Sequence, residues 1–294
     1  MRRFFCVAAV TAAIWPVLST CRGQSAPAGG PSGEAGATTE QEDPTAAPVP
    51  AAPPKRAGTI AKDAASVQAA QRRAAERLEK LGAQLDENDD GDVLGVRAEG
   101  LKLTAADLNR LADLPALASL EIIDTPLTED ALACVGRLVG LRRLYLKNVS
   151  LTDARLSALR GLADLEGLSL PSNRITGKGL GLLSGLGKIE VLNLAHNPLG
   201  DEALPHVGKL PALNTLVLAD TQVTGAGLVH LKPLSMLIVL NLDRCKIAGD
   251  HLLHLKGHDR LRMLYLRGCN VSEEKVNELD EAISGLSIYT SSDD

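Results

Sequence analysis

Histidines are the residues whose spacing most directly suggests chemistry in this chain. His206, His230 and His254 recur every 24 residues, and His251, His254 and His258 follow one another at i, i+3 and i+7. Imidazoles at that second spacing lie on one face of a helix and can gather as zinc ligands. The 24-residue spacing also arises when one repeat is copied into the next, and His258 stands where earlier copies have Leu. We therefore expect no metal and no cofactor, and we interpret His258 as a core residue.

A second candidate for chemistry is the acidic stretch that begins at Asp86. Its sequence DENDDGD matches the opening D-x-N-x-D-G of a calcium-binding loop. Such a loop needs a bidentate Glu at its twelfth position, where this chain has Arg97. The stretch is therefore predicted to be the solvent-exposed turn of a hairpin.

Cysteines and catalytic motifs offer little more. Cys245 and Cys269 are expected on adjacent strands, but side chains that point the same way from parallel strands have poor disulfide geometry, so we predict free thiols. The sequence contains no G-x-S-x-G elbow, no phosphate-binding loop and no H-E-x-x-H motif. The chain is predicted not to be an enzyme.

The N-terminus has the organisation of a secretory signal. Arg2 and Arg3 precede an apolar run over residues 4–18, which is too short for a membrane span. Residues 18–21 resemble a bacterial lipobox that ends at Cys21, although Thr20 departs from the usual small residue. Lipidation of Cys21, with a membrane tether, and cleavage elsewhere are both left open. Either way we expect export to the periplasm, the outer cell envelope or the extracellular space.

Residues 22–58 are rich in Ala, Pro, Gly, Ser and Thr and have no hydrophobic periodicity, which predicts a disordered tether. The net charge of the chain is −5. A protein with this charge has no electrostatic footprint for nucleic acid or an anionic membrane. We therefore do not expect a polyanion as its partner.

The rest of the chain is a repeat. The pattern L-x-x-L-x-L recurs at a strict interval of 24 residues. The clearest copy, over residues 213–236, reads LNTLVLADTQVTGAGLVHLKPLSM and resembles the 24-residue bacterial leucine-rich repeats whose second half reads T-D-x-G-L-x-x-L. Counting the first residue of the pattern as position one, the eight copies start at Val93, Leu117, Leu141, Leu165, Ile189, Leu213, Leu237 and Leu261.

This resemblance implies an α/β fold, a right-handed leucine-rich-repeat solenoid with a curved parallel sheet on the concave side and helices on the convex side. Positions one, four, six and eleven are aliphatic and are expected to point inward. Position nine often holds Asn, Thr or Cys, which can satisfy backbone groups inside the turn. Position twelve is Thr in five copies and is expected to be a helix N-cap.

A stack of repeats needs closed ends. Apolar residues recur every three or four positions over residues 60–81 before Gly82, which predicts a capping helix. We predict five segments. They are a signal over residues 1–21, a tether over 22–58, a capping helix and hairpin over 59–92, eight repeats over 93–284, and a cap strand with an acidic tail over 285–294.

Function is expected on the concave face, which positions three, five, seven and eight should form. Two clusters there are rich in Tyr and Arg, the residues that dominate binding hot spots. We predict a monomeric module that binds another protein through this face. A spacer without a ligand is the structural alternative, and a metal-dependent enzyme that uses the convex histidines is a distant one. The predicted site residues are Arg143, Tyr145 and Lys147 in the first cluster, and Asn241, Asp243, Arg244, Met263, Tyr265 and Arg267 in the second.

Overall fold

The computed structural model describes residues 57–291, which belong to one compact unit of the chain. The predicted signal, Cys21, nearly all of the predicted tether and the last three residues of the acidic tail lie outside the described residues. Helix α2 spans Ala57–Lys80 and so begins two residues before the predicted boundary at residue 59. The last proline before the helix is Pro54, and Ala57 is a residue of the best helix-forming type. Nothing in the sequence therefore prevents the helix from starting at residue 57.

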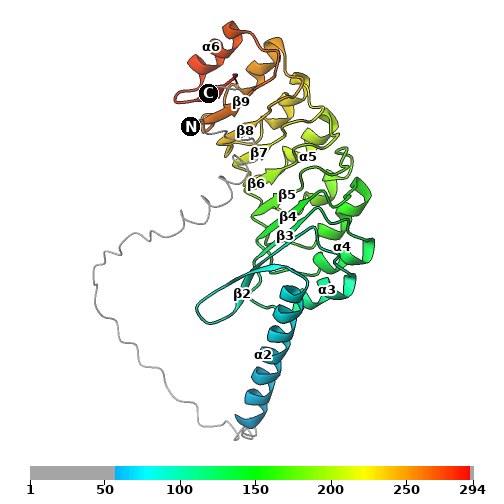
Figure 1. Cartoon of the computed structure of the whole chain (residues 1–294). Coiled ribbons are helices and arrows are strands. Elements are labelled where there is room, and N and C mark those ends of the chain that lie inside the picture. The colour runs from blue at the N-terminus through cyan, green and yellow to red at the C-terminus, as the bar shows by residue number, and fades with distance from the viewer. Residues whose placement is uncertain (1–56, 292–294) are drawn as a thin grey trace, which may run out of the picture. The chain divides into compact units, whose positions relative to one another are not determined.

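Helix α2 closes one end of the repeat stack and projects away from it (Figure 1). Its C-terminal part packs against the repeats, where Ala74 and Leu78 are buried and Arg77 Nε lies 3.0 Å from a carboxylate oxygen of Asp107. The chain leaves the helix through Gly82, which follows Lys80 by two residues and whose positive φ of 95° an L side chain rarely adopts.

The strands form a single ten-stranded sheet in sequence order. The first pair is an antiparallel hairpin across the acidic turn, where Asn88 Oδ1 accepts the amides of Asp90 and Asp92. All later pairs are parallel. The strands are β1 (Gln84–Glu87), β2 (Val93–Glu99), β3 (Ser119–Ile123), β4 (Arg143–Lys147), β5 (Gly167–Ser169), β6 (Val191–Asn193), β7 (Thr215–Val217), β8 (Val239–Asn241), β9 (Met263–Tyr265) and β10 (Ser287–Tyr289).

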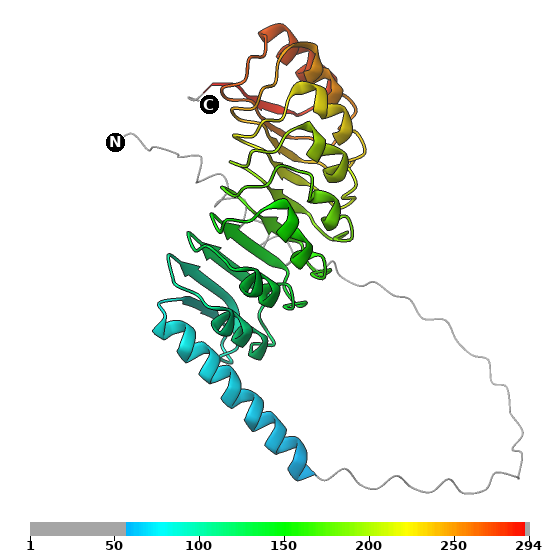
Figure 2. The same ribbon diagram turned by 90° about the vertical axis from the view of Figure 1, so that its right-hand side faces the viewer.

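The helical segments all lie on the side of the solenoid opposite the sheet's outer face (Figure 2). Short α-helices occur near both ends, and most of the middle repeats have 3-10 helices instead. These segments are α3 (Ala105–Asn109), η1 (Arg110–Asp113), α4 (Glu129–Val135), η2 (Asp153–Leu159), η3 (Leu180–Leu183), η4 (Asp201–Ala203), α5 (Leu204–Val207), η5 (Gly225–Leu231), η6 (Gly249–Leu255) and α6 (Glu273–Ala282).

One continuous core runs between the sheet and the helical segments. Leucines at positions four and six of the middle repeats, such as Leu192 and Leu194, are at most 1% exposed. The inward direction predicted for these positions is confirmed. Burial of aliphatic side chains along the whole array supplies most of the stabilisation, because each repeat covers the apolar face of its neighbour.

The predicted role of threonine at position twelve is right in only two repeats. Thr104 and Thr128 accept backbone amides at the starts of α3 and α4. Thr152 and Thr224 precede 3-10 helices and make no side-chain cap, and Thr176 caps no helix either.

The threonines of repeats four and six hydrogen-bond to an aspartate of the preceding repeat instead. The hydroxyl of Thr176 donates to Asp153 Oδ2 at 2.8 Å, and that of Thr224 donates to Asp201 Oδ2 at 2.5 Å. A hydroxyl that donates to a carboxylate makes a stronger hydrogen bond than a neutral cap, which explains the preference.

None of the helices in the part of the chain that the structure describes is long and apolar enough to cross a membrane.

Candidate functional site

The outer face of the sheet, which we call the concave face, carries one unbroken column of position-five side chains. Neighbouring strands pair with these residues directly opposite one another. Strands in a sheet lie about 4.8 Å apart, so the distance between two residues of the column follows from the number of strands that separate them. In order, it consists of Arg97, Glu121, Tyr145, Ser169, Asn193, Val217, Asn241, Tyr265 and Tyr289.

An aromatic cluster occupies the C-terminal end of this column. The rings of Tyr265 and Tyr289 are stacked, with centroids 4.7 Å apart and an interplanar angle of 12°. The Arg267 guanidinium lies over the Tyr265 ring at 5.2 Å, and the Tyr265 hydroxyl lies 3.6 Å from Met263 Sδ. These contacts fix the side chains before any partner arrives. Tyr289 was not among the predicted site residues, although adding one 24-residue period to Tyr265 would have found it.

Asp243 holds the same cluster from the preceding strand. Its Oδ1 accepts the backbone amide of Arg267 at 2.9 Å, and its Oδ2 lies 3.5 Å from Arg267 Nε. Burial raises the pKa of Asp243 above its ordinary value, although the hydrogen bond and the charge of Arg267 oppose the shift. Its neighbour Asn241 is also buried and uses Oδ1 to accept the amide of Asp243 at 2.9 Å.

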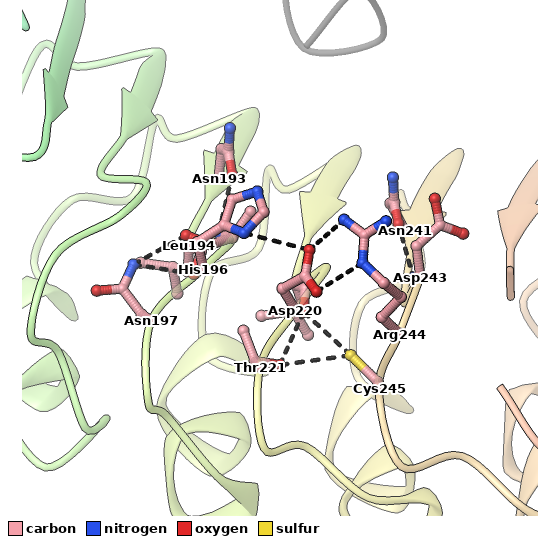
Figure 3. Close-up of polar contacts among 12 residues, drawn as sticks. Asn193, Leu194, His196, Asn197, Asp220, Thr221, Asn241, Asp243, Arg244 and Cys245 are labelled. Atoms are coloured by element: carbon pink, nitrogen blue, oxygen red, sulfur yellow. Dashed lines mark hydrogen bonds and ion pairs between the residues drawn. The ribbon is translucent and has the colours of Figure 1, made fainter. Parts of the chain in front are cut away.

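A charged ladder borders the face at position eight (Figure 3). Asp220 forms an ion pair with Arg244 through two oxygens, and its Oδ2 lies 3.2 Å from His196 Nδ1. The Arg244 hydrogen bond lowers the pKa of Asp220 below its ordinary value, against partial burial. Arg244 was a predicted site residue, whereas His196 and Asp220 were missed. The signal was present, because the three residues are 24 apart.

The backbone at position eight is left-handed in all eight repeats. Asn and Asp tolerate this conformation, Gly prefers it, and a long side chain such as Arg244 adopts it rarely. The backbone conformation at this position is the same for very different side chains. The turn of the solenoid therefore imposes it. The residues, with φ between 51° and 71°, are Gly100, Asp124, Asn148, Ser172, His196, Asp220, Arg244 and Gly268.

The first predicted cluster lies on one strand, β4. Arg143, Tyr145 and Lys147 occupy its alternate positions and are all partly exposed. Neither Arg143 nor Lys147 makes an ion pair with another described residue, whereas Arg97, two strands away, is paired with Glu121 at 2.7 Å. Burial raises the pKa of Tyr145. Tyr145 and Tyr265 are five strands apart, or about 24 Å.

On strands β5 to β8 and the turns after them, the face is lined by small and mostly uncharged side chains, which we call the concave floor and which include Asn241 and Asp243 of the second cluster. Ala195, Val217 and Ala219 form a small apolar cluster of their own there. The floor consists of positions three, five and seven of repeats four to seven, namely Gly167, Ser169, Pro171, Val191, Asn193, Ala195, Thr215, Val217, Ala219, Val239, Asn241 and Asp243.

Three of the residues first considered for chemistry have structural roles. His258 is buried, and its two ring nitrogens lie 2.9 Å and 3.1 Å from the carbonyl oxygens of Leu255 and Leu231. Cys245 and Cys269 are free thiols that donate to the carbonyls of the preceding turn. Burial raises the pKa of Cys269 to about 11, so it is a poor nucleophile at neutral pH. Within residues 57–291, no group of three or more His, Cys, Asp or Glu is placed to hold a metal ion.

Comparisons with known proteins agree with this geometry. A leucine-rich-repeat family model matches residues 139–199. No curated protein matches the sequence. Internalin C2 of Listeria monocytogenes has a similar structure, with a TM-score of 0.54 and 24% identity over 68% of this chain and 81% of that one. The chain has the α/β fold of a leucine-rich-repeat solenoid, and residues 139–199 match the leucine-rich-repeat family.

Two further structures share the fold. The internalin InlF of Listeria monocytogenes matches with a TM-score of 0.51 and 18% identity, over 64% of this chain and 57% of that one. The plant peptide hormone receptor RGFR1, solved in complex with RGF2, matches with a TM-score of 0.51 and 16% identity, over 70% of this chain and 36% of that one. This chain therefore spans little more than half of the one protein and about a third of the other.

Proposed function

We propose that this chain is a non-catalytic, exported protein-interaction module that binds a partner protein through its concave face. The observation that carries the proposal is the C-terminal cluster, where Tyr265 is held between Tyr289 and Arg267. Aromatic and Arg side chains that are fixed in advance lose little conformational entropy on binding, which is why they make effective anchors. RGFR1, a peptide hormone receptor whose structure contains RGF2, has the same fold, which supports a polypeptide as the partner of this chain.

The size of the surface supports a macromolecular partner. The two clusters are about 24 Å apart across five strands. A protein–protein interface of standard size covers such a distance, whereas a small molecule does not. The apolar run over residues 4–18 and the motif at residues 18–21 support export, with Cys21 as the residue that would be lipidated.

The test compares capture of envelope proteins by the full chain and by Tyr265→Ala and Arg267→Ala variants. We expect both variants to bind the captured partner more weakly by about 2 kcal/mol, as truncation of a hot-spot residue does. Val139→Ala is the control, because Val139 is 62% exposed and lies away from the face. If a partner identified with the wild-type chain binds both face variants equally well, the concave face is not its binding site.

Folding must be measured alongside binding. Leu266 lies next to Tyr265 and is fully buried, so Leu266→Ala should destabilise the protein by about 2 to 5 kcal/mol through a core cavity. Tyr265→Ala should cost only about 1 kcal/mol, since it removes one stacked pair. A partner lost with Leu266→Ala alone would show that capture requires the folded solenoid but not the side chains of Tyr265 and Arg267.

A further inference from the structure

The concave floor carries polar groups that the described part of the molecule leaves unused. Ser169, Asn193 and Asn241 all occupy position five and are each at least nine-tenths buried, with 2%, 5% and 2% of their surface exposed. Ser169 Oγ has no hydrogen-bond partner. Buried polar groups in native proteins are nearly always paired, so the Ser169 hydroxyl requires an explanation.

The two asparagines are fixed in the same orientation. Asn193 Oδ1 accepts the amide of Ala195 at 3.0 Å, and Asn241 Oδ1 accepts the amide of Asp243 at 2.9 Å. Each side chain is therefore anchored through its oxygen. Neither Nδ2 group donates to another described residue, and both point away from the sheet into the space above the concave face (Figure 3). The two asparagines thus present NH₂ donors, which would bind hydrogen-bond acceptors such as the carbonyl oxygens of a ligand.

The spacing of these donors selects a backbone conformation. Asn193 and Asn241 are two strands apart with Val217 between them, or about 9.6 Å. In a polyproline II helix, residues i and i+3 share one face and are about 9.3 Å apart. An extended β-strand repeats on one face every two residues, at about 6.6 Å. An α-helix has its carbonyls bonded internally and offers few acceptors. Only the polyproline II spacing matches.

The match extends across the face. Tyr145 and Tyr289 flank the asparagines on alternate strands, so Tyr145, Asn193, Asn241 and Tyr289 are spaced two strands apart throughout. Three such intervals measure about 29 Å, and nine residues of polyproline II measure about 28 Å. The mismatch of about 1 Å over the whole length can be absorbed by side-chain adjustment. A ligand of ten residues would meet two aromatic rings and two amide donors.

The chemistry between these contacts defines the ligand further. The apolar cluster of Ala195, Val217 and Ala219 faces the same space as the two amides. Apolar surfaces made of small side chains accept proline rings and small aliphatic side chains. At the end near β4, Arg143 and Lys147 have no acidic partner among the described residues and favour a carboxylate in the ligand.

We propose that the concave floor binds a proline-containing peptide segment of the partner protein in the polyproline II conformation, with its carbonyls accepting from Asn193 and Asn241. The inference rests on the proposed function and specifies the part of the partner that enters the face. The ligand runs across the strands, carries small apolar residues between its prolines, and has an acidic residue at the end over β4.

The test uses a fluorescein-labelled decapeptide of one Glu followed by three Pro-Ala-Val units, titrated with the full chain and followed by fluorescence anisotropy. Asn193→Asp and Asn241→Asp keep the shape and the anchored oxygen but replace the donor NH₂ with a charged acceptor. We expect saturable binding that each variant weakens at least about tenfold, because repulsion is added to a lost hydrogen bond. Asn270→Asp adds the same charge at an exposed site off the floor and should leave the affinity unchanged.

Three results would overturn the inference. The first is no saturable binding, and the second is equal binding by wild type and both floor variants, given unchanged circular dichroism. The third is equal affinity for a helix-forming decapeptide of Ala, Glu and Lys. Residues 44–54 of this chain, PTAAPVPAAPP, have the ligand's composition. If a peptide of this sequence binds more tightly than the probe and displaces it, the occupant is the chain's own segment, and the assignment to a partner is wrong.

The outcomes separate this inference from the proposed function. If Tyr265→Ala and Arg267→Ala reduce partner capture while the floor variants bind every peptide as wild type does, the face binds a protein but not through a polyproline II segment. If the floor variants lose the probe while partner capture is untouched by all four variants, the floor is a peptide site and the partner binds elsewhere.

Discussion

The first three repeats and the later ones differ in how they pair the backbone groups that lead into the turn after each strand. Strands β2, β3 and β4 have seven, five and five residues, whereas β5 to β9 have three each. Where strands are long, the sheet itself pairs the backbone groups that lead into the turn. In repeats four and five, whose strands are short, side chains at position nine add several hydrogen bonds to backbone groups of their own and the preceding turn, more than Thr125 makes in repeat two. The same 24-residue pattern is therefore compatible with a larger or a smaller share of hydrogen bonds from side chains to the backbone.

Position nine shows the difference most clearly. Val149 in repeat three has no hydrogen-bonding group, whereas Asn173 in repeat four contacts five backbone groups. Asn173 Oδ1 accepts the amides of Val149 and Leu151, and Nδ2 donates to three carbonyl oxygens, the shortest contact being 2.8 Å to Leu146. Asn197 repeats the arrangement one turn later.

The largest effect should come from Asn173→Ala, which removes all five contacts. We expect a loss of about 4 kcal/mol in the free energy of unfolding, because several buried backbone groups become unpaired. Val149→Ala is the matched change in the earlier region and should cost about 2 kcal/mol, the value of the lost apolar contact. Chemical denaturation measures both. Equal losses would show that the asparagine ladder adds nothing beyond packing.

A smaller effect is expected at Asp153, which links repeats three and four. Its carboxylate accepts the amides of Thr176, Gly177 and Gly179 at 2.8 to 3.0 Å, besides the Thr176 hydroxyl. Partial burial alone would raise the pKa of Asp153, but these hydrogen bonds outweigh it and the pKa lies below its ordinary value. Asp153→Asn should cost about 2 kcal/mol at pH 7, since an amide cannot accept on both sides.

The pH dependence gives the sign of this contribution. Because the folded-state pKa of Asp153 is lowered, its stabilisation is present above the unfolded value near 3.9 and disappears as pH falls through the folded value. The difference in stability between wild type and Asp153→Asn should therefore be constant near neutrality and shrink below about pH 4. A difference that persists unchanged at pH 2 would assign the loss to packing.

The threonines at position twelve sharpen the comparison on the convex side. Thr128 caps α4 by accepting the amide of Ala131 at 3.2 Å, whereas Thr152 makes no cap in the next repeat. Thr128→Ala should cost about 1 kcal/mol, and Thr152→Ala less than about 0.5 kcal/mol. Thermal unfolding of the two variants side by side would test this, and a reversed order would contradict the hydrogen-bond assignments.

The smallest effect should come from an exposed pair between repeats. Lys188 Nζ lies 2.6 Å from Asp164 Oδ1, but both side chains are more than half exposed. Water and salt screen such pairs, so Asp164→Asn should leave the unfolding transition unchanged within measurement. A clear loss of stability that disappears at high salt would mean that surface pairs contribute more to this solenoid than its buried ladder suggests.

The sequence predicted the periodic part of the structure and missed interactions that depend on two different positions. The period and the aliphatic columns placed the strands and the core, because one residue type at one position determines each of them. The bond between Asp153 and Thr176 joins position thirteen to position twelve of the next repeat, which a column-by-column comparison does not reveal. Likewise, whether Thr152 caps a helix depends on the geometry of the following turn, which is 3-10.

The candidate surface was predicted to a similar extent. Alternation in the strands placed Tyr145 and Tyr265 on one face, and the structure puts both there in one column. The orientation of Asn193 was beyond sequence reasoning, because it depends on the amide of Ala195 in a turn whose conformation no local motif specifies. Tyr289 lies past the last full repeat, but one more 24-residue period from Tyr265 reaches it, so the sequence held the signal for it.

The aspartate links also set the size of the module from which this array can be built. Asp153 and Asp201 are 48 residues apart, as are the threonines they hold, so the linked stretch is periodic in pairs of repeats. Removing or duplicating a single 24-residue unit there would preserve every aliphatic column but place an aspartate opposite the wrong neighbour. Removing or duplicating 48 residues would preserve the aliphatic columns and would also keep each remaining aspartate opposite a threonine. An engineer who wished to lengthen or shorten this solenoid should therefore cut and join it two repeats at a time.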